Sequence, residues 1–281
     1  LVRGTVSYSA EAIGSLGAID TLRATADLQR ASLSVDALNF AKAAGEPAKL
    51  AVDLAFKKGA VEVRDFALTN DFGAEPPVVE AEASGAAGAA PKKLTPIAVF
   101  GTARFGAHGY IETVNLPRVQ LGEDSNFAVE AKRADSGILE LTLTGESIDL
   151  SGLITSAVEA GPRSDERSEF GWGVGAVLRG RVNKLHARGD SVYSDASLDL
   201  RRGAERMEAL DFSARTADGK PLSVVLKETG SENGPRQVVE ARTDDIGALL
   251  SSVFDIRSIM GGEGVMEVLV SDKKNGEQGL K

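Results

Sequence analysis

The sequence is poor in the residues that most often cross-link or fill a small domain. It has no cysteine, which excludes a disulfide framework and a thiolate metal site. Aromatic residues make up only 5% of the 281 positions, and most of the apolar residues are Ala, Val and Leu. No stretch approaches the roughly 18 apolar residues that a membrane-crossing helix needs. The sequence therefore predicts thin apolar layers of small side chains and no transmembrane helix.

Positive charge is also scarce relative to negative charge. The formal net charge is −9 at pH 7, and residues of both signs are spread along the chain. Such a charge does not suit binding to a nucleic-acid backbone, so we expect no nucleic-acid partner. The chain begins at Leu1 rather than at an initiator Met. We therefore expect a fragment of a longer chain, with any signal or membrane anchor outside it.

Residues with the spacing of a catalytic or metal site are missing as well. The two histidines, His108 and His186, have no carboxylate at the spacing of a ligand set or a catalytic triad. The glycine-rich stretch at 172–180, WGVGAVLRG, lacks the Lys-Ser/Thr ending of a phosphate loop. The adjacent Asp244 and Asp245 fit a helix cap better than a general acid and base. We predict no enzymatic activity, no cofactor and no metal site.

Apolar and polar residues alternate with the period of β-strands along most of the chain. The alternation is clearest at 49–57, 127–132 and 139–144, and a series of further strands, among them 207–214, follows. Turn residues separate such stretches at Lys58-Gly59, Asp135-Ser136-Gly137, Asp218-Gly219 and Asn233-Gly234. This pattern predicts an all-β fold, mainly antiparallel, in which the strand–helix alternation of βαβ units is missing.

Two stretches depart from this pattern. Residues 11–23 have no clean period and fit either a turn or a short helix. Residues 84–93, SGAAGAAPKK, are small and low in complexity, which predicts a flexible surface loop. A linker between two domains is the alternative, but the strand pattern resumes unchanged after it. We therefore predict that residues 1–281 form one continuous segment.

One motif occurs twice and predicts two short helices. Residues 149–158 read DLSGLITSAV, and residues 245–254 read DIGALLSSVF. Each copy places an Asp before an apolar run with helical spacing, so we expect Asp149 and Asp245 to be N-caps. Two capped helices that simply pack on a sheet are one interpretation. We favour a repeating unit, in which a short helix punctuates a long run of strands.

Successive strands share one apolar face. Its members recur at every second position: Leu139, Leu141, Leu143, Leu210, Phe212, Leu222, Val224, Leu226, Val268 and Val270. Such a face is typical of a filled β-sandwich core, but it also fits an elongated curved sheet whose apolar side lines a groove for acyl chains. A strand of seven residues spans about 23 Å, which is comparable to an extended lipid tail. Because sandwiches usually fill their middle with large rings, the low aromatic content favours the groove.

Three stretches carry a family resemblance: residues 39–69, 139–154 and 238–270. The last contains Asp244-Asp245-Ile246-Gly247-Ala248-Leu249-Leu250 followed by Gly261-Gly262. Together the three stretches resemble the large members of the AsmA-like family of bacterial envelope proteins. The shared motifs are structural rather than catalytic.

The resemblance implies a repeating β-groove in the periplasm, anchored to the inner membrane through a segment outside this chain. It also implies that the groove carries phospholipid by its acyl chains towards the outer membrane and supports lipid homeostasis there. Other envelope proteins are further partners to expect. The alternative is a non-enzymatic scaffolding β domain that binds protein partners during envelope assembly. That alternative predicts a filled core without a continuous apolar channel.

Overall fold

The computed structural model of the protein describes residues 1–15, 18–70, 94–160, 175–203, 206–229 and 236–270. A large sheet begins with β2 (Ser7–Ser15), β3 (Ala18–Asp27), β6 (Lys49–Lys57), β7 (Ala60–Thr69), β8 (Ile97–Phe105), β9 (Ile111–Leu121), β10 (Ser125–Arg133) and β11 (Leu139–Asp149). After α1 (Ser151–Ala160) it continues with β12 (Ala176–His186), β13 (Val192–Arg202), β14 (Met207–Arg215), β15 (Pro221–Thr229) and β16 (Arg236–Thr243), and after α2 (Ile246–Phe254) it ends with β17 (Gly264–Val270). A small sheet consists of β1 (Val2–Gly4), β4 (Ala31–Val35) and β5 (Phe40–Lys42). Two 3-10 helices, η1 (Asp36–Leu38) and η2 (Arg188–Asp190), follow β4 and β12.

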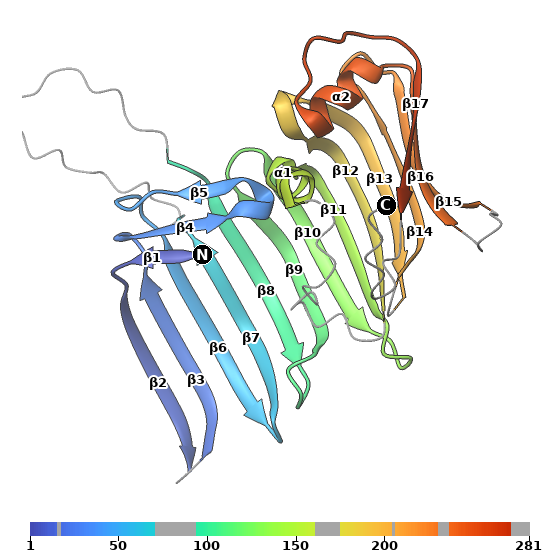
Figure 1. Ribbon diagram of the computed structural model, residues 1–281. Helices are drawn as coiled ribbons and strands as arrows, with labels where there is room; N and C mark the ends of the chain where they lie inside the picture. The colour runs from blue at the N-terminus through green and yellow to red at the C-terminus, as the bar shows by residue number, and fades with distance from the viewer. Residues whose placement is uncertain (16–17, 71–93, 161–174, 204–205, 230–235, 271–281) are drawn as a thin grey trace, which may run out of the picture.

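The large sheet has 14 strands in the order β17-β16-β15-β14-β13-β12-β11-β10-β9-β8-β7-β6-β3-β2. Figure 1 shows it as a single layer, with the small sheet, α1 and α2 gathered near one end of its strands. The predicted all-β fold, mainly antiparallel with two short helices, is confirmed.

One pair of neighbouring strands breaks the antiparallel pattern. β11 and β12 are parallel, from Leu139↔Ala176 to Asp149↔His186, and α1 lies between them in the chain. These three elements form a βαβ unit. The expectation that such units are missing is therefore wrong at this place. Alternation shows which residues share a face, but it carries no information about the direction of the neighbouring strand.

The stretch at 11–23, which fitted either a turn or a short helix, belongs to a β-hairpin. β2 and β3 pair antiparallel from Ser7↔Asp27 to Ser15↔Ala18. All 9 residues of β2 are exposed, so neither face of this edge strand requires apolar side chains and its period is weak. The loop predicted at 84–93 lies outside the described residues.

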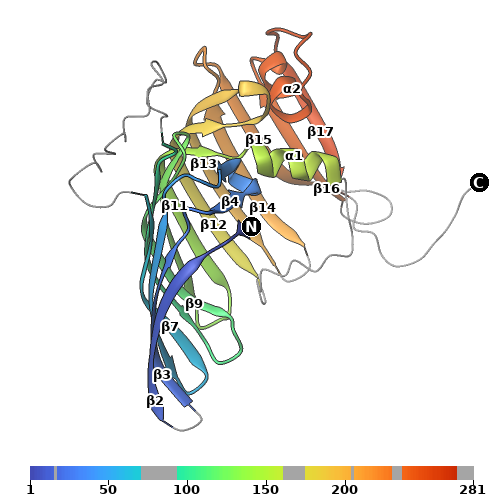
Figure 2. The ribbon, with the colours of Figure 1, turned by 90° about the vertical axis from the view of Figure 1, so that its left-hand side faces the viewer.

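Register shifts interrupt the ladders of several neighbouring strands. They occur beside Asp53 in β6, Phe127 in β10 and Ser194 in β13, among other places. Each such bulge adds a residue to one strand, bends that strand and increases its local twist. The large sheet curves toward the side on which α1 and α2 lie (Figure 2). We call this side the inner face and the opposite side the outer face.

A hydrophobic core closes the inner face near the ends of the strands that meet α1 and α2. It joins Leu33 and Phe40 of the small sheet, Leu249 of α2, and large-sheet residues such as Val119, Phe127, Leu185 and Leu222. Leu150 and Ile154 pack against this core at α1. A second, smaller core of Ala131, Leu139 and Ala176 lies farther along the same strands. Among the described residues, the helices and the small sheet that lie on the inner face are gathered at one end of the strands.

The two helices lie close to their predicted positions. Asp245 is the N-cap of α2, and its Oδ1 accepts a hydrogen bond from the N–H of Ala248 at 3.0 Å. Asp149 is instead the last residue of β11, two positions before α1 begins, because the ladder with β12 extends as far as His186. The expectation that Asp149 occupies the N-cap position is corrected accordingly. Its Oδ1 still accepts from the N–H of Ser151 at 2.8 Å, which satisfies a free donor of the first turn.

Neither α1 nor α2 is long and apolar enough to cross a membrane, and no other helix among the described residues is.

Candidate functional site

The register of the large sheet aligns apolar inner-face residues into rows across the strands. The lower row runs from β2 to β14 through Ala12, Leu22, Leu54, Val63, Ala103, Val114, Ala131, Leu141, Leu178, Leu200 and Leu210. The upper row runs from β9 to β17 through Leu116, Val129, Leu143, Gly180, Leu198, Phe212, Val224, Ala241 and Met266. Neither row contains a polar side chain. With 14 strands at a spacing of about 4.8 Å, the inner face follows an arc of about 60 Å.

Many side chains in the two rows are half-buried rather than enclosed. Leu143, Phe212 and Val224 of the upper row have intermediate exposure, and so do Leu141 and Leu210 of the lower row. In a β-sandwich, the inner faces of two sheets interdigitate and bury such residues. Here the described residues leave the middle of the inner face accessible from solvent.

The residues expected from the sequence to line a groove lie on the inner face. The register places nine of them there: Leu139, Leu141, Leu143, Leu210, Phe212, Leu222, Val224, Leu226 and Val268. Leu139 and Leu222 are buried in the two cores, whereas Val268 on the edge strand is 47% exposed. Val270 pairs with Gln237 through the main chain, but its side chain lies outside the described part of the structure.

An apolar pocket of about 210 Å³ lies on the inner face beneath α1. Its lining includes Leu150 and Leu153 at the start of α1, and Leu143, Gly180, Leu198 and Phe212 from four adjacent strands. The surface that these residues expose to the pocket is apolar throughout. The pocket therefore continues the upper row, with α1 as its roof.

Sequence reasoning identified Leu143 and Phe212 but missed the part played by Gly180. In the sequence, Gly180 stands out only as part of the stretch at 172–180, a poor match to a phosphate loop. In the structure it lies in β12, while residues 172–174 fall outside the described ranges. A glycine inside an alternating strand was the available signal, since it removes a side chain from one face of the sheet.

The outer face is polar and carries ion pairs between neighbouring strands. Arg179 and Asp199 approach to 3.7 Å, with both side chains exposed. Glu240 accepts hydrogen bonds from Arg242 Nε and, at 2.7 Å, from Lys227 Nζ. These two hydrogen bonds lower the pKa of Glu240 to about 2. The two faces of the sheet thus differ sharply in chemistry.

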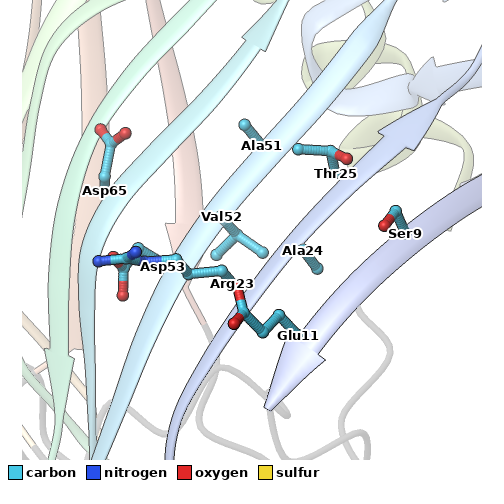
Figure 3. Close-up of a pocket in the computed structure, with 9 residues that line it drawn as sticks. All are labelled: Ser9, Glu11, Arg23, Ala24, Thr25, Ala51, Val52, Asp53 and Asp65. Carbon is cyan, nitrogen blue, oxygen red and sulfur yellow. The ribbon is translucent and has the colours of Figure 1, made fainter. Parts of the chain in front are cut away.

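A hollow of about 400 Å³ lies on the outer face of β2, β3, β6 and β7 (Figure 3). Short side chains such as Ser9 leave it open, and its charged residues are Glu11, Arg23, Asp53 and Asp65. Arg23 Nε donates to Asp53 Oδ2 at 2.9 Å. Within the described ranges, no group of three or more His, Cys, Asp or Glu side chains could hold a metal ion. We assign no ligand to this hollow.

Similarity to known proteins does not identify the chain: no family model, no curated protein and no solved structure matches it. The inner face and its pocket are therefore the features on which a function can be proposed.

Proposed function

We propose that this chain is a periplasmic segment of an inner-membrane-anchored protein that carries phospholipid between the inner and outer membranes. Acyl chains lie on the apolar rows of the inner face, while headgroups stay in water at its open side. The activity is non-catalytic and needs no cofactor. This is also the function that the AsmA-like resemblance implies.

The observation that supports this proposal most is the continuity of the two rows. Each square ångström of apolar surface removed from water stabilises a bound chain by about 25 cal/mol, so an acyl chain gains from contact anywhere along them. Because no polar side chain interrupts a row, a lipid meets a similar surface at each successive strand. A uniform surface of this kind allows movement across the strands without a large barrier between neighbouring positions.

The proposal can be tested by photo-crosslinking in cells. A photoreactive residue at Leu141 or at Val224, both half-buried on the inner face, should form adducts with phospholipid. Mass spectrometry of the purified protein identifies the adducts.

The matched control is the same photoreactive residue at Glu140, which is exposed on the outer face next to Leu141. It should capture no lipid. Equal capture at all three positions, or capture at none, contradicts the proposal.

A scaffolding role is supported by a different observation, the free edges of the large sheet. β2 and β17 each have only one neighbour among the described strands. On β17, Val265 and Leu269 are 57% and 64% exposed, and Glu267 is the single charged residue. Natural edge strands are usually blocked by Lys, Pro or bulges, so an edge like this one can accept a strand from a protein partner. Protein adducts from a probe at Leu269, with no lipid adducts from the inner face, favour scaffolding over transport.

A further inference from the structure

The pocket beneath α1 differs from the rest of the inner face because it is a hollow rather than a surface. We propose that it binds the methyl-terminal part of a single alkyl chain and so gives the inner face one fixed holding position, at the parallel β11–β12 pair. This inference rests on the proposed lipid-carrying function and specifies where a carried chain is held.

The chemistry of the pocket selects an apolar ligand. Its exposed surface is apolar throughout, so a polar group placed there loses its hydrogen bonds to water without replacement. Apolar cavities of about 150 Å³ stay free of water and accept molecules the size of benzene. At about 210 Å³, this pocket is larger than such a cavity.

Gly180 creates the hollow because it has no side chain. Two other glycines on the inner face leave no comparable space. A Cβ added at Gly101 would lie 2.1 Å from the carbonyl oxygen of Asn115, and one added at Gly145 would lie 2.5 Å from the Cβ of Phe127. Those two glycines permit close packing of neighbouring strands. A Cβ added at Gly180 would meet only the Cβ of Leu198, at an ordinary 3.6 Å. The missing side chain at Gly180 therefore leaves open space.

The roof of the pocket is held firmly in place. Gly152 of α1 packs directly on the main chain of η1, and Asn39 Nδ2 donates to Asp149 Oδ2 at 3.1 Å. Leu153 of α1 is 49% exposed and lines the pocket. From there the upper row continues over Leu198 and Phe212, so a ligand longer than the pocket extends onto the inner face. A linear chain fits this arrangement, with its end inserted and its remainder lying on the row.

The test measures binding of cis-parinaric acid, a fatty acid whose fluorescence rises when its chain leaves water, to the whole chain. Gly180→Leu fills the pocket and should weaken saturable binding at least about tenfold. Ser213→Leu, which adds an apolar side chain at an exposed outer-face position two strands away, is the matched control and should bind like the unmodified protein. Unchanged binding by Gly180→Leu, or equal losses in both variants, overturns the inference.

A second variant covers the case in which Gly180→Leu fails to fold. Leu153→Glu places a carboxylate at the exposed rim without altering the sheet, and it should also weaken binding at least about tenfold at neutral pH. Palmitate should displace the probe, whereas displacement by cholesterol at equal concentrations shows that the pocket takes rigid rings and overturns the alkyl-chain assignment.

Photo-crosslinking at Leu54, the lower-row residue of the distant strand β6, separates this inference from the proposed function. If Leu54 captures phospholipid while both pocket variants bind the probe normally, the pocket inference fails and lipid carriage stands. If neither Leu54 nor the pocket engages lipid, the proposed function itself fails.

Discussion

The two copies of the repeated motif form helices that are anchored in different ways. The first turn of α2 is held by residues that directly follow the helix, while farther along it Tyr193 of β13 donates a hydrogen bond to Ser252 Oγ at 2.7 Å. The N–H of Ile246 donates to the carbonyl of Gly262 at 2.7 Å, and Gly247 packs against the main chain of Ile259, Met260 and Gly261. The contacts of the first turn are therefore local in sequence, and α2 connects two antiparallel strands, β16 and β17.

The first turn of α1 is instead held by residues from the N-terminal part of the chain. Asp149 binds Asn39, which is 110 positions earlier, and Gly152 packs on the carbonyl of Asp36. α1 connects parallel strands, and it roofs the apolar pocket. A closely similar sequence therefore has its first turn fixed by local contacts in α2 and by long-range contacts in α1. The difference lies in what each helix packs against rather than in the motif.

The largest difference between the two helices should come from their glycines. A Cβ at Gly152 would lie 1.7 Å from the carbonyl oxygen of Asp36, so Gly152→Ala forces α1 and η1 apart and should lower the free energy of unfolding by about 3 kcal/mol. At Gly247 the nearest atom is the carbonyl oxygen of Ile259 at 2.5 Å, in an exposed segment that can shift. Gly247→Ala should therefore cost about 1 kcal/mol. Urea unfolding measures both.

Ser156→Ala is the control for these two variants, because Ser156 is exposed on α1 and a change there meets no packed neighbour. It should change the free energy of unfolding by less than about 0.5 kcal/mol. Equal losses from Gly152→Ala and Gly247→Ala contradict the distinction between long-range anchoring of the first turn of α1 and local anchoring of the first turn of α2.

The elements that could be predicted from the sequence are those whose cause is local. β10 and β11 follow from alternation around the turn at Asp135-Ser136-Gly137, and the cap at Asp245 acts on an N–H only three residues away. The pocket could not be predicted, because it requires α1 to lie over Gly180. That contact depends on the parallel pairing of β11 with β12, which alternation does not encode. The same pairing keeps Asp149 in the sheet and moves it out of the expected cap position.

The two aspartates offer a second and smaller test of the comparison. Asp149 accepts hydrogen bonds from Ser151 and from Asn39, so Asp149→Ala breaks both a helix contact and the link to the small sheet. It should cost about 2 kcal/mol of the free energy of unfolding. Asp245→Ala removes chiefly the cap on Ala248 and should cost about 1 kcal/mol.

Asn replacements provide the control for both sites. Asp149→Asn and Asp245→Asn each keep a side-chain oxygen that can accept from the helix, so each should recover most of the loss seen with Ala in the same urea titrations. A larger loss at Asp245 than at Asp149 reverses the expected order and removes the long-range role assigned to α1.

Charge should distinguish two ionic contacts of the outer face more subtly. In β16, the strand before α2, the Glu240 side chain is 6% exposed and binds Arg242 and Lys227, whereas the Arg179–Asp199 pair of β12 and β13 is about 60% exposed on each side. The pKa of Glu240 is lowered from its ordinary value of 4.5 to about 2 in the folded chain, so its contribution to stability is complete above pH 4.5 and is lost as the pH falls towards 2. Glu240→Gln should therefore be less stable than the unmodified protein at pH 7, and this difference should vanish in urea unfolding near pH 2.

Asp199→Asn should show little difference at either pH, because exposed ion pairs contribute little. If Asp199→Asn shows the same pH-dependent loss as Glu240→Gln, then the ionic support is general to the outer face and is not a property of the buried Glu240.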